Sequence, residues 1–261
     1  MIIEPASRRV LVTGSGAGLG LALARAFATA GDVVFLTDIS PGVADAAQAL
    51  SAETARTAHS AVLDLAEDGA ADRLVAEASD AMGGIDILIN NAVIRKMSPV
   101  AELGDADWNR AIEVNLSAPF RLIRACLPAM QERGWARIIN MASVYSLIAM
   151  AGRVDYVTTK HAIVGLTRTV ALELAATRIT CNAICPGLMA TESALARIDA
   201  LAVERNIGKE EATSLFLSTR QPGGRFIPTE TVTELALFLC GPRSEGINGA
   251  AIPVDNGWSF A

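Results

Sequence analysis

Short apolar runs alternate with helical patterns along most of the chain. The first two runs, at 10–13 and 33–37, have the length of buried strands. Similar runs lie at 61–63, 85–89, 137–141, 179–184 and 251–254, with helical patterns between them at 19–30, 106–114, 117–133 and 156–176. Continuous apolar strands separated by helices are typical of a parallel sheet covered on both faces. The pattern predicts one doubly wound α/β domain over residues 1–261.

Residues 190–228 depart from this alternation. They contain two helical patterns, at 195–204 and 210–217, with no strand between them, and they follow a predicted strand end at Pro186 and Gly187. Doubly wound sheets bind ligands at the carboxyl ends of their strands. We therefore interpret the segment as a helical lid over the ligand crevice, with a purely structural insertion as the alternative.

Composition supports a globular chain and argues against several classes of partner. Hydrophobic residues make up 51% and charged residues 19% of the 261 positions, which is enough apolar material for a substantial core. The net charge of -6 argues against a broad nucleic-acid or anionic-membrane surface. No apolar run reaches the about 18 residues of a membrane span, and residues 1–10 lack a signal-peptide pattern. We expect a cytoplasmic protein that binds neither nucleic acid nor membrane, with its four cysteines reduced and buried.

A glycine-rich segment, TGSGAGLG at 13–20, joins the first predicted strand to the first predicted helix. Glycines there let the backbone turn tightly and approach a pyrophosphate, and the helix N-terminus offers free N–H groups to the anion. Such a string is weak evidence alone, but its place between a strand and a helix indicates dinucleotide binding. The expected contacts are Gly14, Ser15, Gly18, Leu19 and Gly20.

The second predicted strand ends at Asp38, which Ile39 follows. A carboxylate there can accept hydrogen bonds from the adenosine ribose hydroxyls of NAD and would repel the 2′-phosphate of NADP. No Arg or Lys occupies 15–17 or 39–40 to neutralise that phosphate, so we predict NAD as the cofactor. The alternative is that Asp38 only caps a turn.

Further cofactor contacts are expected where later strands end, because those ends meet along one edge of the sheet. For Thr191, the alternative to a cofactor contact is a role in loop geometry only. The expected residues are Asp64 and Leu65 near the adenine, Asn91 and Ala92 at the adenosine ribose, and Pro186, Gly187 and Thr191 at the nicotinamide.

Tyr156 and Lys160 lie four residues apart in a predicted helix, so both side chains point to one face. A phenol titrates at about pH 10 in water, and a neighbouring ammonium favours the phenolate. The pair is therefore suited to take a hydroxyl proton while a hydride leaves the alcohol carbon. Ser143 would hold the substrate oxygen, and Asn115 would hold a water that relays the proton. Lys160 would also bind the nicotinamide ribose, and this chemistry needs no metal.

These residues together resemble the short-chain dehydrogenase/reductase family over nearly the whole chain. The matching motifs are the glycine-rich segment, Asn90-Asn91-Ala92, Asn115, Ser143 and Tyr156-x-x-x-Lys160. The resemblance implies a Rossmann fold, hydride transfer between a nicotinamide and a secondary alcohol, and a homotetramer. Within the family, the segments 133–140, 156–168, 180–187 and 254–258 are most similar to the bacterial 3-hydroxybutyrate dehydrogenases.

The positions that hold the substrate carboxylate in that subfamily differ here. Where the resemblance implies Gln, His, Lys and Gln, the chain has Arg95, Tyr145, Arg153 and Arg197, and Leu188 replaces a lid tryptophan. Arginine forks suit a carboxylate, sulfonate or phosphoryl group. Arg153 and Arg197 also resemble the sulfonate-binding arginines of 2-hydroxypropyl-coenzyme M dehydrogenases. The expected substrate residues are Arg95, Ser143, Tyr145, Arg153, Tyr156, Leu188, Arg197 and Trp258.

We therefore expect a small anionic hydroxy compound with more charge, or a larger anion, than 3-hydroxybutyrate. The alternative role of the arginines is in surface salt bridges. Two other functions stay open. An NADPH-dependent 3-oxoacyl reductase shares the fold and catalytic residues, although Asp38 disfavours NADP. A nucleotide-binding protein without activity is disfavoured by the complete set Asn115, Ser143, Tyr156 and Lys160.

Overall fold

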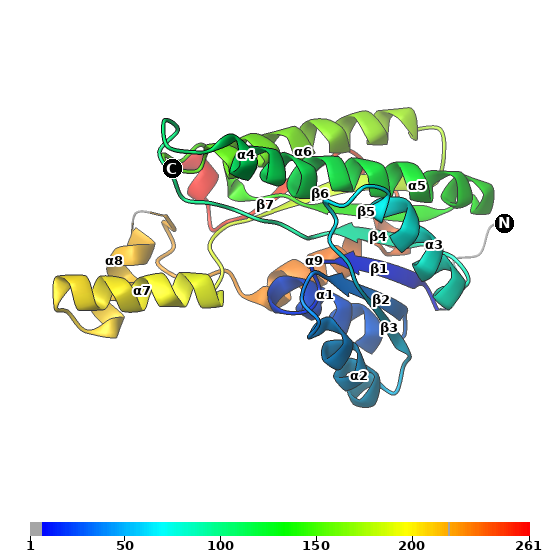
Figure 1. The fold of residues 1–261 in the computed structure, drawn as a ribbon, viewed down its shortest axis with the longest axis horizontal. Coiled ribbons are helices and arrows are strands. Elements are labelled where there is room, and N and C mark those ends of the chain that lie inside the picture. The colour runs from blue at the N-terminus through cyan, green and yellow to red at the C-terminus, as the bar shows by residue number, and fades with distance from the viewer. Residues whose placement is uncertain (1–6, 219) are drawn as a thin grey trace.

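The computed structural model describes residues 7–218 and 220–261, which form a parallel sheet covered by helices on both faces (Figure 1). Seven strands lie in the order β3-β2-β1-β4-β5-β6-β7. Their bounds are Arg9–Thr13 (β1), Val33–Asp38 (β2), Ala58–Val62 (β3), Ile87–Asn90 (β4), Ala136–Met141 (β5), Ile179–Pro186 (β6) and Ala251–Val254 (β7). The order reverses beside β1, where the chain crosses from β3 to β4, and this confirms the doubly wound fold. Ligand sites lie at such reversal points.

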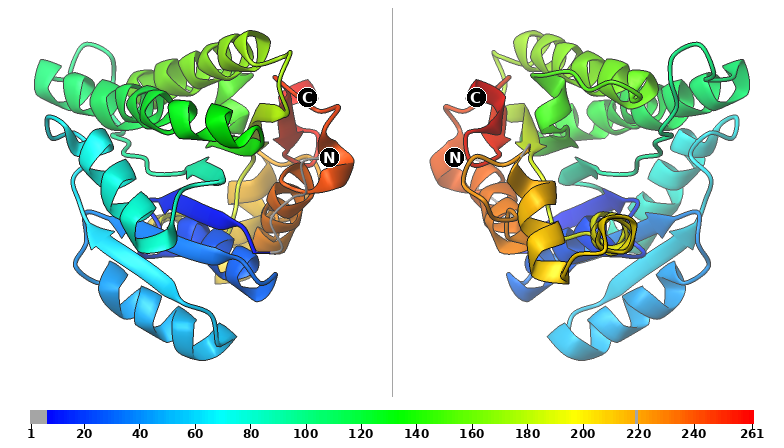
Figure 2. Two further views of the ribbon diagram at one scale, coloured as in Figure 1. Left: turned by 90° about the vertical axis from the view of Figure 1, so that its right-hand side faces the viewer. Right: turned by 90° about the vertical axis from the view of Figure 1, so that its left-hand side faces the viewer.

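Helices from different parts of the chain cover each face of the sheet (Figure 2). On one face lie α1 (Gly18–Thr29), α2 (Val43–Thr54) and α9 (Thr229–Leu239), with α1 in contact with the other two. The other face carries α3 (Ala70–Met82), α4 (Asp105–Ile112), α5 (Ala118–Arg133) and α6 (Val154–Glu173). No helix among the described residues combines the length and apolar character needed to cross a bilayer.

The continuous apolar character of the strands follows from burial on both faces. Successive side chains of a strand point to opposite faces, and β1 shows the result. Val10 and Val12 pack in the core under α1 and α9, whereas Leu11 packs in the core under α3 and α5. All four cysteines are buried and free of disulfides, as expected.

One strand is longer than its sequence pattern indicates. The apolar run at 61–63 predicts only a short third strand, whereas β3 covers Ala58–Val62 and pairs with β2 alone. An edge strand is less buried than a central one, and β3 therefore includes the polar residues His59 and Ser60. Because of these polar side chains, a search for apolar runs detects only part of β3.

The segment 190–228 forms a helical insertion that projects beyond the sheet at its carboxyl edge (Figure 1). It consists of α7 (Glu192–Arg205) and α8 (Lys209–Ser218), close to the two predicted helical patterns. A β-bridge between Met189 and Ile227 brings the ends of the insertion together. The insertion has its own small core, in which Ile198, Ala212 and Phe216 are buried. Its role as a lid stays a prediction.

Candidate active site

A cavity of about 410 Å³ runs along the carboxyl edge of the sheet, a volume within the range of small-molecule sites. Its lining includes residues at the ends of six different strands. Gly14 follows β1, Asp38 ends β2, Asp64 follows β3, Asn91 follows β4, Ser143 follows β5 and Gly187 follows β6. The fold therefore collects residues that are far apart in the sequence, from Gly14 to Trp258, into one site.

The cavity includes all but three of the residues expected to bind cofactor or substrate or to act in catalysis. The exceptions are Ser15, Gly18 and Asn115, which do not line it. The Ser15 hydroxyl is buried, donates to the Val12 carbonyl at 2.8 Å and accepts from the Thr37 N–H at 3.0 Å. Its side chain therefore stabilises the loop from behind. The expected residues that line the cavity are Gly14, Leu19, Gly20, Asp38, Ile39, Asp64, Leu65, Asn91, Ala92, Arg95, Ser143, Tyr145, Arg153, Tyr156, Lys160, Pro186, Gly187, Leu188, Thr191, Arg197 and Trp258.

The glycine-rich loop can adopt the compact shape that suits a dinucleotide because Gly14 and Gly20 lack side chains. Any side chain at these two positions would collide with neighbouring atoms. A Cβ at Gly14 would come within 2.6 Å of the Ala92 Cα, and one at Gly20 within 2.1 Å of the Gly14 carbonyl oxygen. Asn91 holds the loop against β4 by donating to the Thr13 and Gly14 carbonyls at 3.0 and 2.9 Å. The first turn of α1 has no side-chain cap. Its N–H groups are therefore suited to a pyrophosphate.

The two carboxylates of the lining, Asp38 and Asp64, lie at the ends of β2 and β3. Asp38 accepts from the Gly16 and Ser40 N–H groups, each at 3.0 Å, so it caps the turn as well as lining the cavity. Asp64 binds Arg110 at 2.8 Å, and this contact lowers the pKa of the Asp64 carboxyl. Arg110 also lines the cavity and was not expected there. The predicted contacts with ribose and adenine stay predictions.

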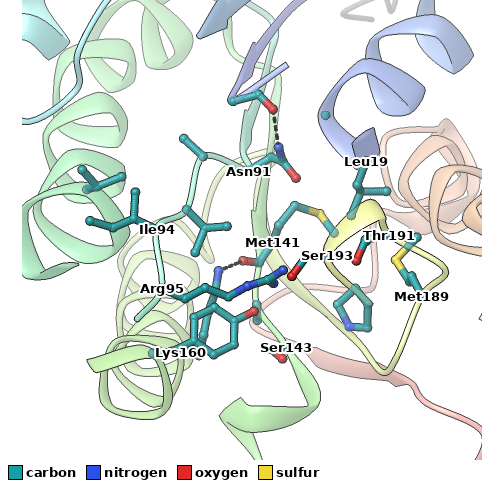
Figure 3. A pocket seen from close by; sticks show the side chains of 18 of the residues that line it. Leu19, Asn91, Ile94, Arg95, Met141, Ser143, Lys160, Met189, Thr191 and Ser193 are labelled. Atoms are coloured by element: carbon teal, nitrogen blue, oxygen red, sulfur yellow. Dashed lines mark hydrogen bonds between the residues drawn. The ribbon is translucent and has the colours of Figure 1, made fainter. Parts of the chain in front are cut away.

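Lys160 is buried beside the ring of Tyr156 in the first turns of α6. Its Nζ donates to the Met141 carbonyl at 2.5 Å and lies 5.6 Å from the Tyr156 ring centroid. Burial lowers the pKa of Lys160 to about 8. Figure 3 shows Lys160 and Ser143 facing the same cavity, with the dashed bond from Lys160 to Met141. The protonated form of Lys160 places a positive charge close to the ring of Tyr156.

Ser143 is held by a local capping arrangement at the end of β5. Its Oγ accepts from the Tyr145 N–H at 3.2 Å, while the Ser146 Oγ accepts from the Ser143 N–H at 3.2 Å. The residue is only 6% exposed, and its hydroxyl lines the cavity. Because Oγ serves as an acceptor toward the backbone, its proton can be donated to a ligand oxygen.

Asn115 lies in a π-helical turn, Glu113–Ser117, that interrupts the path from α4 to α5. Its Oδ1 accepts from the Ile94 N–H and its Nδ2 donates to the Ile94 carbonyl, both at 2.9 Å. Nδ2 also donates to the Thr159 hydroxyl of α6 at 3.2 Å. The side chain therefore fixes the loop after β4 against α6, and the predicted water relay stays a prediction.

Asp155 fixes the same loop two residues further on, a role that the sequence analysis missed. It is 2% exposed, and its Oδ2 accepts from the Lys96 N–H at 2.9 Å. Asn115 and Asp155 thus hold the backbone on either side of Arg95. The Arg95 side chain extends into the cavity between Lys160 and Ser193 in the view of Figure 3. An acidic residue in the first turn of a helix is common for reasons of helix dipole alone, and the sequence carries no further signal of this contact.

We expect Asp155→Ala to raise KM for an anionic substrate about tenfold, with a smaller change in kcat, because Arg95 loses one of its two backbone supports. Asp155→Asn keeps an acceptor oxygen and should restore most of the loss. Asp72→Ala is the matched control, since Asp72 is an exposed acid in the first turn of α3. Steady-state kinetics of the three variants measure the effect. An unchanged KM in Asp155→Ala would show that Arg95 needs no such support.

Four arginines surround the catalytic end of the cavity, and we call them the arginine cluster: Arg95, Arg153, Arg197 and Arg220. Burial and the neighbouring charge of Arg95 lower the pKa of Arg153, and burial and the charge of Arg220 lower that of Arg197. Across residues 7–218 and 220–261, no ion pair joins an acid to Arg95, Arg153 or Arg197. These three thus line the cavity instead of forming surface salt bridges.

Arg220 is the member of the cluster that sequence reasoning missed. It follows α8, and only the fold of the helical insertion returns it to the cavity. Its guanidinium donates to the Phe216 carbonyl at 2.9 Å and lies 4.5 Å from the Phe216 ring centroid. No local pattern marks the residue, because its position depends on the path of the insertion.

Tyr145 connects the arginine cluster to Tyr156. Its ring packs edge-on against Tyr156, with centroids 6.1 Å apart, and against Trp258 at 5.5 Å. Burial raises the pKa of Tyr145, whereas the charges of Arg220, Arg153 and Arg197 oppose that rise. A ligand beside Tyr156 would therefore lie within reach of several permanent positive charges.

Comparison with known proteins agrees with this arrangement. Residues 8–200 match the family described as short chain dehydrogenase. The D-beta-hydroxybutyrate dehydrogenase of Rhizobium meliloti (strain 1021) is 37% identical over 257 residues, covering 97% of this chain and 99% of the relative. The 3-oxoacyl-[acyl-carrier-protein] reductase FabG of Aquifex aeolicus is 32% identical and covers 95% of each chain. The crystal structure of L-sorbose reductase from Gluconobacter frateurii, complexed with NADPH and L-sorbose, superposes with a TM-score of 0.93 at 27% identity over 100% of both chains.

Proposed function

Because this chain belongs to the short-chain dehydrogenase family, a family of nicotinamide-dependent oxidoreductases that act on CH–OH groups, we propose that it oxidises a small anionic hydroxy acid with NAD. The observation that carries the proposal is the position of the arginine cluster beside Tyr156, Lys160 and Ser143. A cavity with permanent cations at its catalytic end is suited to an acid and unsuited to a neutral alcohol.

The residues of this chain divide the work of alcohol oxidation. Ser143 donates a hydrogen bond to the substrate oxygen and orients the hydroxyl toward Tyr156. The Tyr156 phenolate takes the hydroxyl proton, and the charge of Lys160 stabilises that phenolate. Asn115 keeps the Ile94 backbone and α6 in register around the pair. The nicotinamide, when bound, accepts the hydride. In ketone reduction the same groups act in reverse, with Tyr156 as the proton donor.

The preference for NAD follows from the carboxylate of Asp38 at the end of β2. We expect kcat/KM with NAD to exceed that with NADP by at least about 100-fold, because a 2′-phosphate would lie against an anion already bonded to the loop backbone. Asp38→Ala should lower efficiency with NAD and raise it with NADP. Asp45→Ala, which removes an exposed acid in the first turn of α2, is the control. Equal use of both cofactors by the unmodified protein would refute the assignment and favour the reductase alternative.

The substrate class is tested by a panel rather than by one compound. NAD-linked turnover of hydroxy acids, hydroxysulfonates, hydroxyphosphonates, dicarboxylates and sugar acids should exceed turnover of neutral secondary alcohols of equal size. Neutral alcohols oxidised as efficiently as any acid would refute an anionic substrate. The cytoplasmic location and the homotetramer implied by the family resemblance, and closure of the helical insertion over the substrate, belong to the same proposal.

A further inference from the structure

The arginine cluster consists of two pairs on two different parts of the fold, and we propose that they bind a substrate with two anionic groups, one group to each pair. This inference rests on the proposed function and goes further, since a single carboxylate would satisfy that function. The substrate class is a hydroxy compound with two carboxylates, or with one carboxylate and one sulfonate or phosphonate.

The first pair, Arg95 and Arg153, belongs to the body of the domain. Arg95 lies in the loop after β4 that Asn115 and Asp155 hold in place, and Arg153 is the N-cap residue of α6. A β-bridge between Ser98 and Arg153 joins the loop to the start of the helix. The charge of Arg95 contributes to the lowered pKa of Arg153, so the two guanidiniums act on one another.

The second pair, Arg197 and Arg220, belongs to the helical insertion. Both guanidiniums lie over the ring of Phe216, at 5.1 and 4.5 Å from its centroid. Phe216 is buried in the small core of the insertion and therefore gives the two side chains a common rigid support. After burial, the charge of Arg220 is the largest cause of the lowered pKa of Arg197.

The distribution of charge along the cavity favours anions at this end. The four arginines and Lys160 line the catalytic end, whereas the acids of the described lining, Asp38 and Asp64, follow β2 and β3 at the other end. Asp155 offsets part of the charge of Arg153 but lies outside the cavity lining. Like charges in a partly buried cavity repel one another, and a bidentate contact to one guanidinium uses both oxygens of a carboxylate.

Both pairs line the cavity that Tyr156 lines, one from the body of the domain and one from the helical insertion. The charge of Arg153 reaches Arg197, and both act on Tyr145, whose ring packs against Tyr156. Anions held by the two pairs would therefore flank the carbon that faces Tyr156. A monoanion of the same length would contact only one of the two pairs, and this difference makes the proposal measurable.

The test compares two substrates that differ in one group. 3-Hydroxyglutarate carries the carbinol and carboxylate of 3-hydroxybutyrate and replaces its methyl group by a second acetate arm. We expect the dicarboxylate to have a kcat/KM at least about 100-fold higher with NAD, the factor for a pair of charge-assisted contacts. Comparison with hydroxy acids that carry a sulfonate or a phosphonate in place of the second carboxylate shows which group serves as the second anion. Glutarate should inhibit competitively at concentrations where butyrate does not.

Variants assign the groups to the pairs. Arg153→Gln and Arg197→Gln should differ in selectivity. One variant should lower kcat/KM for both substrates, and the other should lower kcat/KM by about 100-fold for the dianion alone. Arg220→Gln should follow Arg197→Gln. Arg225→Gln, an exposed arginine of the same insertion outside the cavity lining, is the control and should change neither value.

The inference is overturned if all dianions and 3-hydroxybutyrate have the same kcat/KM, or if every variant lowers both substrates equally. Should a variant fail to fold, inhibition of the unmodified protein by glutarate gives an independent answer. If glutarate inhibits no more strongly than butyrate, the second anionic contact is also refuted. The proposed function fails in a different way, through absence of NAD-linked turnover with any hydroxy acid. Efficient oxidation of 3-hydroxybutyrate alone would therefore refute the dianionic substrate and leave the proposed function intact.

Discussion

Tyr156→Phe should lower kcat for alcohol oxidation by about 10³-fold while NAD still binds, because the change removes the one hydroxyl that takes the substrate proton. The aromatic ring, which packs edge-on against Tyr145 and lies 5.6 Å from the Lys160 ammonium, is retained. The loss should therefore be chemical and not structural. The rate of NADH formation at saturating substrate gives kcat, and calorimetric titration with NAD gives the affinity.

Tyr145→Phe provides the comparison, since it removes the same atom from the neighbouring ring. Its hydroxyl lies 2.8 Å from the Met150 sulfur, a weak partner, and the ring keeps its contact with Trp258. We expect the change in kcat to stay within about tenfold, with any larger effect in KM. If Tyr156→Phe retains more than about a tenth of the activity, another group must accept the proton and the catalytic assignment is wrong.

Gly20→Ala should abolish measurable NAD binding and lower the free energy of unfolding by about 3 kcal/mol. The new Cβ would lie 2.1 Å from the Gly14 carbonyl oxygen and 2.6 Å from the Asn91 Nδ2. Asn91 holds the loop through its bonds to Thr13 and Gly14, so neither neighbour can move without opening the loop. Denaturant unfolding and titration with NAD measure the two effects.

Gly165→Ala is the matched control for this substitution. Gly165 is exposed within α6, and a Cβ there would meet no atom within 4 Å. Alanine in an exposed helical position should stabilise the protein by about 0.5–1 kcal/mol, without effect on NAD. Wild-type affinity for NAD in Gly20→Ala would mean that the loop tolerates a side chain and that its glycine is not needed for the close approach.

The predictable part of the site consists of residues whose partners are near in sequence or are set by the sheet. The glycine-rich loop lies between one strand and the next helix, so its function follows from a segment of eight residues at 13–20. Tyr156 and Lys160 share a helix face because they are four residues apart. Asp38 and Ser143 lie at the carboxyl edge because a parallel sheet brings all such ends together.

The less predictable part depends on long connections. Ser15 belongs to the same glycine-rich segment as Gly14, yet its hydroxyl faces the Val12 carbonyl and not the cavity. The water relay at Asn115 stays a prediction, and the bonds of its amide to Ile94 and Thr159 were not expected from the sequence. Each outcome is set by which backbone groups the fold brings within hydrogen-bond distance, and spacing along the chain does not contain that information.

By itself, the amino-acid sequence determined the doubly wound sheet and pointed to Tyr156 and Lys160 as the candidate catalytic pair, since the alternation of strands and helices and the spacing of four residues are local properties of the chain. Only the tertiary structure decided that Asp155 supports Arg95 through Lys96 and that Arg220 returns from the helical insertion to join Arg197. Those contacts join segments whose separation is set by packing, and the arginine cluster is complete only where they converge.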